Sequence, residues 1–382
     1  LINNVCLNSM RYYFHCMHII KKYLIKKTKK HQEILLVSAI TQIVFLGFKE
    51  YAVIDCSVNI AKKLNIYHGL VNAFLKNILR DKDILLKTTI NFCELPLWFI
   101  NETKDLDTAD QKIFLQNFYR MPDLHLMFKN EKNFLDFEEE IEPTSFKSGF
   151  LKKRKKITEI SSYKKGTWWV QDFSSALPLI DLPGEILAKK NIDLCCAPGG
   201  KSFQILSRSK IIKMNDKNNL RLDIVKENLK RLHFKPEILN RDALELDLSI
   251  KYDFIIIDAP CSSIGTVRKN PEILFKKNGP EFGKLLKLQQ NLIKKGSQLL
   301  NNNGIMLYMV CSFLKKETID QVNNFLKTNK DFTQINLFIN KNFKNNKFLK
   351  NEYFFTLPDN INGYSIDGYY ATYLKKISNE IN

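Results

Sequence analysis

Short apolar runs alternate with amphipathic stretches between residues 191 and 310. The apolar runs have the length of buried strands, whereas Leu285, Leu288, Leu292 and Leu299 repeat at helical spacing. This alternation predicts an open α/β sheet. The predicted strands are 192–194, 211–214, 236–239, 254–257 and 305–310, the predicted helices are 201–206, 220–232 and 285–300, and a turn is predicted at 301–304.

The first part of the chain has a different pattern. Within residues 31–80, Ile34, Leu35, Ile40 and Ile43 fall on one helical face, and further helices are predicted over 52–64 and from residue 69. The simplest explanation of these apolar stripes is the core of a helical bundle. Signals between 91 and 165 are mixed. The predicted division is therefore an all-α domain at 1–90, a linker or small α+β subdomain at 91–165, and an α/β domain at 166–382.

A sharp turn separates the first predicted strand from its helix. It consists of Ala197, Pro198, Gly199 and Gly200, and the helix then opens with Lys201. Glycine lets the backbone approach a ligand closely, and a helix N-terminus offers free N–H groups and a partial positive charge. Strand, glycine turn and helix make the first half of a nucleotide-binding unit. A glycine pair alone is a weak signal for such a site.

Three of the predicted strands end at or near an aspartate. Asp216 lies about 20 residues beyond the turn, where a carboxylate can bind the ribose hydroxyls of an adenosine. Asp242 and Asp258 follow the next two strands. Ligands bind at the C-terminal strand ends of open α/β sheets, so all three are candidates for ligand binding. The alternative is that Asp216 and Asp242 are ordinary caps.

Two strands also lead into a Cys-Ser pair, at Cys261-Ser262 and at Cys311-Ser312. A single free cysteine is usually a small buried hydrophobe. Two such pairs at strand ends favour chemistry, because a thiolate is a strong nucleophile.

Composition narrows the class of protein. The chain has 382 residues and a net charge of +19, which fits either solvated lysines or a polyanionic partner such as RNA. Its eight cysteines form no spaced disulfide framework, and its six histidines lack metal-ligand spacing. No apolar run has the length of a membrane span. We therefore expect a cytoplasmic protein with free thiols, without a metal or a membrane partner.

Several of these motifs resemble those of a known family. Ala197 to Lys201, Asp258 to Ser262 and Cys311-Ser312 resemble the signature motifs of RNA cytosine-C5 methyltransferases of the Sun/Fmu/RsmB group. The resemblance continues through residues 265–272 and 367–371, and residues 71–75 resemble a NusB-like domain. It implies a Rossmann-like class I methyltransferase domain that uses S-adenosylmethionine, preceded by an all-α NusB-like domain that binds RNA.

The resemblance also implies roles for individual residues. Cys311 would be the nucleophile that adds to cytosine C6, Cys261 would assist release, and Asp258 would hold the cytosine. The loop of Cys195, Cys196, Ala197, Pro198, Gly199, Gly200 and Lys201 would bind the cofactor together with Asp216, Asp242 and Asp258, the two adjacent cysteines being structural. Lys201, Arg268 and Lys269 would contact RNA. The sequence departs from the family pattern at Val310, where threonine is usual, and retains only Glu317 of a Pro-Glu-Glu-Asn segment.

The predicted function is methylation of cytosine C5 in 16S rRNA by a monomeric enzyme. A tRNA methyltransferase of the same family is the first alternative. A non-catalytic RNA-binding assembly factor is the second, although Cys261, Cys311 and Asp258 are all present. A nucleotide-dependent dehydrogenase would have no use for two Cys-Ser strand ends.

Overall fold

The computed structural model describes residues 1–145, 147–209, 211–339, 346–350 and 352–377. The chain divides into two compact units: Leu1–Tyr119 with Val267–Gly279, and Arg120–Thr266 with the remainder from Pro280. These limits differ from the three predicted segments, because the helices up to residue 119 pack with the first unit and the strands from residue 125 belong to the second.

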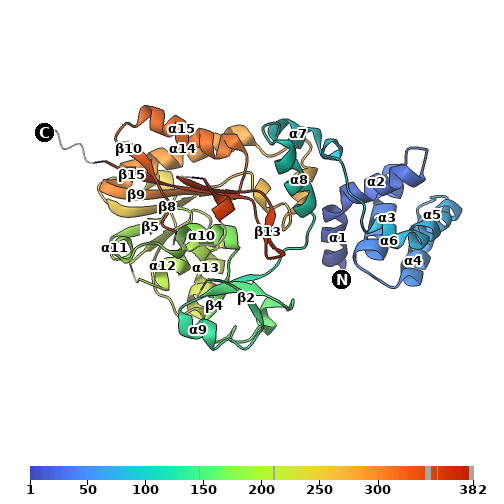
Figure 1. The fold of residues 1–382 in the computed structure, drawn as a ribbon, viewed down its shortest axis with the longest axis horizontal. Helices are drawn as coiled ribbons and strands as arrows, with labels where there is room; N and C mark the ends of the chain where they lie inside the picture. The colour runs from blue at the N-terminus through green and yellow to red at the C-terminus, as the bar shows by residue number, and fades with distance from the viewer. Residues whose placement is uncertain (146, 210, 340–345, 351, 378–382) are drawn as a thin grey trace. The chain divides into compact units, whose positions relative to one another are not determined.

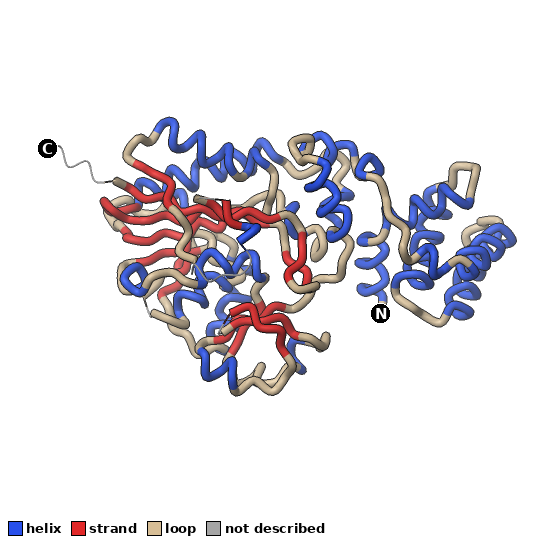
Figure 2. Tube along the Cα trace, viewed as in Figure 1, coloured by secondary structure: helices blue, strands red, loops and turns tan. Residues whose placement is uncertain are grey.

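In the described part of the first unit, helices joined by loops are the regular elements (Figure 2). Helix α5 shows why, since its buried residues Val71, Phe74, Leu75 and Ile78 repeat at the spacing that places them on one face. They join a core supplied mainly by α2, α3 and α4. The helices are α1(Ile2–Arg11), α2(Tyr13–Tyr23), α3(Lys30–Ile40), η1(Thr41–Phe45), α4(Glu50–Lys63), α5(His68–Arg80), α6(Lys82–Leu85), η2(Phe92–Glu94), α7(Leu97–Glu102), α8(Thr108–Asn117) and η6(Pro271–Phe275).

A segment distant in sequence completes this unit. Residues 267–279 pack against α1 and α2, where the Arg11 guanidinium donates hydrogen bonds of 2.8 and 3.2 Å to the Arg268 carbonyl. The rings of Tyr13 and Phe275 meet edge to face with centroids 5.0 Å apart. The motif that follows Asp258 in sequence is therefore shared between the two units.

The second unit is built on a large mixed sheet in the order β11-β12-β15-β9-β8-β5-β6-β7, with β10 also paired to β15. The strands from β9 to β7 are parallel, and β15 runs antiparallel to β9. The strands are β5(Asn191–Asp193), β6(Lys213–Asn215), β7(Glu237–Leu239), β8(Tyr252–Asp258), β9(Leu300–Val310), β10(Phe332–Ile335), β11(Leu349–Lys350), β12(Tyr353–Thr356) and β15(Tyr369–Lys376). The predicted α/β fold is confirmed.

Alternation along the central strands gives each face of this sheet its own core. In β8, Phe254 and Ile256 join the core with α10, α12 and α13, whereas Ile255 and Ile257 join the core with α14 and α15 (Figure 1). Burial on both faces explains the continuous apolar run of this strand. The helices of the unit are α9(Glu131–Leu135), η3(Ile157–Glu159), α10(Phe173–Ile180), α11(Gly184–Leu187), α12(Gly200–Leu206), α13(Asn219–Arg231), η4(Ala243–Glu245), η5(Ile264–Thr266), α14(Phe282–Leu299), η7(Lys315–Glu317), α15(Ile319–Thr328) and η8(Asn346–Phe348).

Two smaller sheets complete the second unit. One has the order β2-β3-β1-β4, and the other is the hairpin β13-β14. Their strands are β1(His125–Phe128), β2(Ile141–Ser145), β3(Ser148–Leu151), β4(Trp168–Val170), β13(Asp359–Ile361) and β14(Tyr364–Ile366).

The prediction of a turn at 301–304 is wrong, because these residues belong to strand β9 and do not interrupt the sheet. Strand β9 runs from Leu300 to Val310, with Leu300 opposite Tyr252 but Ile305 opposite Phe254. The pairing register therefore shifts by three residues within the strand, and the polar composition of 301–304 resembles that of a turn.

Candidate active site

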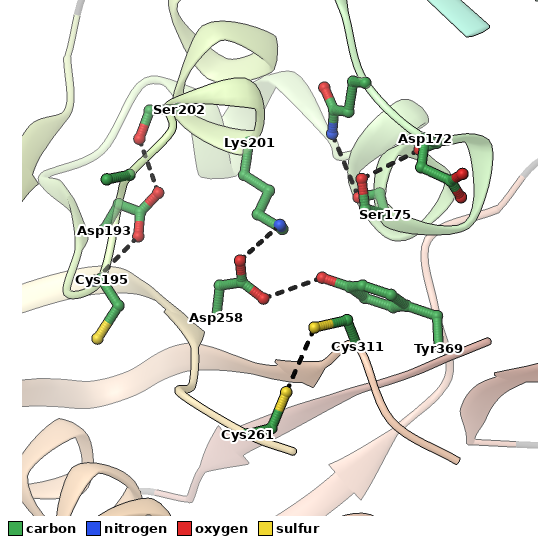
Figure 3. Close-up of polar contacts among 12 residues, drawn as sticks. Asp172, Ser175, Asp193, Cys195, Lys201, Ser202, Asp258, Cys261, Cys311 and Tyr369 are labelled. Carbon is green, nitrogen blue, oxygen red and sulfur yellow. Dashed lines mark hydrogen bonds and ion pairs between the residues drawn. The ribbon is translucent and has the colours of Figure 1, made fainter. Parts of the chain in front are cut away.

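The site lies where the parallel strands of the large sheet end. Strands β9, β8, β5 and β6 are neighbours in that order, so their C-terminal ends share one edge. This edge brings together the segments after Asp193, Asp258 and Val310 (Figure 3). Strand order therefore places the glycine turn and both Cys-Ser pairs in one neighbourhood.

The turn before α12 requires glycine at one position in particular. Gly199 has a φ of 112°, and a Cβ built there would lie 2.2 Å from the ring of Phe203. Other residues rarely adopt this φ, and the buried Phe203 leaves them no space. The turn then passes directly into α12, whose second residue is Lys201.

Lys201 forms an ion pair with Asp258 at the edge of the sheet. Its Nζ lies 2.6 Å from Oδ2 of Asp258, and the Tyr369 hydroxyl donates a 2.9 Å hydrogen bond to Oδ1 (Figure 3). Burial alone would lower the pKa of Lys201, but the Asp258 carboxylate outweighs it and the net shift is upward. The lysine is therefore a fixed positive charge, and both carboxylate oxygens of Asp258 are held.

The two cysteines of the Cys-Ser pairs are in direct contact. Sγ of Cys261 lies 3.3 Å from Sγ of Cys311, which in turn lies 3.5 Å from the Ser263 hydroxyl oxygen. A hydrogen bond from Cys261 lowers the pKa of Cys311, and this effect together with the charge of Lys201 prevails over burial. The same hydrogen bond, together with burial, raises the pKa of Cys261. Cys311 is thus favoured as the thiolate and Cys261 as the thiol.

A second carboxyl group is hydrogen-bonded to the residues that flank the glycine turn. Asp193 at the end of β5 is fully buried, accepts a 2.7 Å hydrogen bond from the Ser202 hydroxyl and accepts a 3.3 Å bond from the Cys195 N–H. Burial raises the pKa of Asp193 to about 7, aided by the charge of Asp258 and opposed by the bond from Ser202.

This raised pKa has a consequence for stability. The folded state keeps a proton on Asp193 that the unfolded chain releases near pH 3.8, so stability falls as the pH rises from about 4 to about 7. Asp193→Asn removes this titration. We expect it to increase the free energy of unfolding at pH 8 by about 2–4 kcal/mol and leave it nearly unchanged at pH 4. Urea denaturation at several pH values measures both; a variant that retains the parent's pH slope would contradict the expectation.

Asp216 and Asp242 both accept hydrogen bonds from nearby backbone. Asp216, at 3% exposure, accepts from the Asn218 N–H at 2.9 Å and from the Ala197 N–H at 3.2 Å, so it links the end of β6 to the glycine turn. Asp242 accepts a 3.0 Å bond from the Leu244 N–H as the cap of a short 3₁₀ turn. The capping alternative therefore describes Asp242, whereas the N-cap of α13 is Asn218 and not Asp216. A carboxylate oxygen can accept a second hydrogen bond, so capping does not prevent ligand binding.

The remaining predicted residues differ in exposure. Cys196 is buried and Cys195 is partly buried. Lys269 is also partly buried. The side chain of Arg268, which we expected to contact RNA, has 0% exposure in this structure. Its basic character suggested a surface residue, but only the fold shows that it is packed inside.

Sequence reasoning gave no role to three side chains that meet the predicted residues. They are Tyr369, which donates to Asp258; Asp193, which binds Ser202 of α12; and Glu317, which binds both serines of the Cys-Ser pairs. Glu317 had one signal, as the retained residue of the family's Pro-Glu-Glu-Asn segment. Tyr369 lies within residues 367–371, which resemble the family, whereas Asp193 lies at a strand end that identifies no chemistry.

Two further properties concern metals and membranes. Within the described ranges, no group of three or more His, Cys, Asp or Glu side chains is arranged to hold a metal ion. The helices that the structure describes do not include one long and apolar enough to cross a membrane.

Comparisons with known proteins identify two families that match parts of this chain. Residues 187–375 match a family described as 16S rRNA methyltransferase RsmB/F, and residues 1–80 match the NusB family. The ribosomal RNA small subunit methyltransferase B of Pasteurella multocida is 28% identical over 364 residues, which cover 87% of this chain and 80% of that protein. Its counterpart in Photorhabdus laumondii is 27% identical over 340 residues, covering 82% and 78%.

Solved structures share the fold. The crystal structure of PH0851 covers 98% of this chain and 89% of its own, with a TM-score of 0.70 and 20% identity. NSun6 from Pyrococcus horikoshii, solved with SFG, covers 74% and 99%, with a TM-score of 0.57 and 15% identity. The predicted arrangement of an all-α NusB-like domain before a Rossmann-like methyltransferase domain is confirmed. Residues 187–375 thus form a methyltransferase domain of the RsmB/F family, and residues 1–80 form a NusB-family domain.

Proposed function

We propose that this protein is an S-adenosylmethionine-dependent RNA cytosine-C5 methyltransferase that acts on 16S rRNA. The observation that carries the proposal is the contact of Cys261 with Cys311, 3.3 Å apart, beside the Lys201–Asp258 ion pair. Family membership supports methyl transfer, and the names of the relatives support rRNA as the substrate.

The reaction requires activation of a carbon that is a poor nucleophile. The thiolate of Cys311 adds to cytosine C6, which forms an S–C6 bond and makes C5 electron-rich. Bound S-adenosylmethionine supplies the electrophilic methyl group that C5 takes up. A base then removes the C5 proton, and the electrons of that bond expel the Cys311 thiolate from C6. Asp258 is positioned by Lys201 and Tyr369 to hold the ring.

The cysteine contact explains how Cys261 can assist release. Its pKa is raised chiefly by its hydrogen bond to Cys311 and by burial, with the charge of Cys311 adding to them. Once Cys311 carries the cytosine it is an uncharged thioether, and both of its effects on Cys261 are lost. Cys261 then deprotonates more readily and can accept the C5 proton. Addition thus prepares the base that the last step needs.

The residues around the glycine turn suit the methyl donor. Gly199 lets the backbone approach a ligand, and Asp216 at the end of β6 has acceptor positions for ribose hydroxyls. Asp242 follows the next strand. Its Oδ2 lies 3.6 Å from Lys217 Nζ, and we assign this oxygen to the adenine edge. Residues 195–201 would line the methionine part of the cofactor.

Trapping the covalent intermediate tests this function. In Cys261→Ala the release step loses its base, so RNA remains attached to Cys311. We expect a slower-migrating, nuclease-sensitive species on a denaturing gel after expression in bacterial cells, and sequencing of the attached RNA then identifies the substrate. The Cys261→Ala, Cys311→Ala double variant is the control and forms no such species.

Each outcome of the trap has a distinct meaning. Attached 16S rRNA supports the full proposal, whereas attached tRNA keeps the chemistry and changes the substrate. An adduct that persists without Cys311 would overturn the role of that residue. No adduct in the trap variant and no methyl transfer by the parent would favour a non-catalytic RNA-binding factor.

A further inference from the structure

A buried carboxylate joins the two segments that carry the cysteines. Glu317 ends the short helix η7, a few residues beyond β9, and its side chain is 0% exposed. Oε1 accepts hydrogen bonds from the Ser262 N–H at 2.8 Å and from the Gln289 side chain at 3.1 Å. Oε2 accepts from the hydroxyls of Ser262 and Ser312, the latter at 2.6 Å.

These contacts lie just after the residues at which β8 and β9 stop pairing. The pairing of β8 with β9 ends at Asp258 opposite Met309, so Cys261 and Cys311 both lie beyond the paired residues. One backbone hydrogen bond still joins the two segments after the paired residues: the Gly265 N–H donates to the Cys311 carbonyl at 3.1 Å. Glu317 accepts hydrogen bonds from Ser262 and Ser312, the residues that follow the two cysteines. A chain segment outside a sheet is otherwise free to shift, and thiol contacts require a narrow range of positions.

The donors that satisfy Glu317 carry no charge. Throughout the residues that the structure describes, no Lys or Arg forms an ion pair with it. A buried carboxylate without a cation is retained only where several hydrogen bonds compensate its desolvation. A glutamine or an apolar residue would fill the same space at lower electrostatic cost. The negative charge therefore needs an explanation beyond packing.

We propose that Glu317 is a positioning residue of this reaction, which holds Cys261 against Cys311 through the two serines and directs the shared proton to Cys261. The inference rests on the proposed function. Glu317 touches no reacting atom and acts through its neighbours.

The charges around the two cysteines support the direction of proton sharing. Cys261 faces Cys311, Glu317 and the buried Tyr308, whose hydroxyl donates to the Glu317 carbonyl at 2.8 Å. Cys311 faces Cys261, Ser263, Asp258, Tyr369 and Lys201. Glu317 adds to the raised pKa of Cys261, whereas Lys201 contributes to the lowered pKa of Cys311. The two charges act on different cysteines and favour the same proton location.

Thiol labelling tests the charge of Glu317 without any RNA. The full-length protein is treated with iodoacetamide near pH 8, and mass spectrometry measures the initial ratio of label on Cys261 to label on Cys311. In Glu317→Gln the carboxylate charge is gone, and we expect this ratio to rise about three- to tenfold. Glu317→Asp keeps the charge, so its ratio should stay close to the parent's.

Measurement of kcat tests whether the length of the Glu317 side chain matters. Glu317→Asp is too short to reach both serines, and we expect each Glu317 variant to lower kcat at least about tenfold with the KM for RNA nearly unchanged. The matched control is Asp253→Asn, at the other end of β8, where the carboxylate accepts from the Lys190 N–H and the Asn301 side chain. It should leave labelling and kcat unaltered.

The outcomes separate this proposal from the proposed function. A parent protein without methyl transfer would refute the function, while the labelling ratio would still test Glu317. Glu317 variants that fold and match Asp253→Asn in both labelling ratio and kcat would overturn the positioning role. If neither variant folds, Ser312→Ala removes one donor to the carboxylate and must lower kcat; full activity in that variant would also overturn it.

Discussion

Cys311→Ser is expected to lose methyl transfer by at least about a thousandfold, because a serine hydroxyl does not ionise near neutral pH and is a far weaker nucleophile than a thiolate. The environment of Cys311 is suited to a thiolate, with a hydrogen bond from Cys261 and the charge of Lys201 both lowering its pKa. Serine is nearly isosteric and keeps the contact with Cys261. Initial rates of methyl incorporation into 16S rRNA fragments measure the loss.

The Cys311→Ser variant should still bind S-adenosylmethionine. Cys311 follows β9 and is not among the residues that we assign to the cofactor, so affinity for S-adenosylmethionine should match the parent's. Calorimetric titration of the variant with the cofactor provides this control. Retention of more than about a tenth of the parent rate would mean that another group attacks C6 or that no covalent step occurs.

Lys201→Met is expected to reduce both stability and activity. The Nζ to Oδ2 distance to Asp258 is 2.6 Å, and the two side chains are only 14% and 20% exposed. Removing the lysine leaves a largely buried carboxylate without its cation, which should cost about 2–4 kcal/mol of unfolding free energy. It also removes a charge that favours the Cys311 thiolate, so kcat should fall at least about a hundredfold. Denaturant unfolding and initial rates measure the two effects.

A double variant distinguishes these two consequences. Lys201→Met with Asp258→Asn leaves no unpaired carboxylate, so it should recover most of the lost stability and none of the activity. Lys213→Met is the matched control, because its ion pair with Glu237 has partners 27% and 53% exposed and should contribute less than about 1 kcal/mol. If the double variant is as unstable as Lys201→Met, the unpaired charge is not the cause.

The local pattern of apolar and polar residues was sufficient to predict most of the α/β core. Strand β8 is a continuous apolar run, and α5 has buried residues at strict helical spacing, so each is recognisable without its neighbours. The polar segment 301–304 was misleading because this irregular part of β9, where the register shifts, has the composition of a turn. Parallel pairing also follows from alternating strands and helices, and it implies that strand ends meet at one edge.

The sequence by itself determined the fold class and the candidate reacting groups, Asp258, Cys261 and Cys311, since their motifs are local. Only the tertiary structure decided what surrounds them. Tyr369, Asp193 and Glu317 reach the site from strands and loops that are distant in sequence or carry no motif, and Arg268 is buried despite its charge. The physical reason is that pKa values and hydrogen bonds depend on distance in space. Sequence spacing does not report that distance for segments joined only through the sheet.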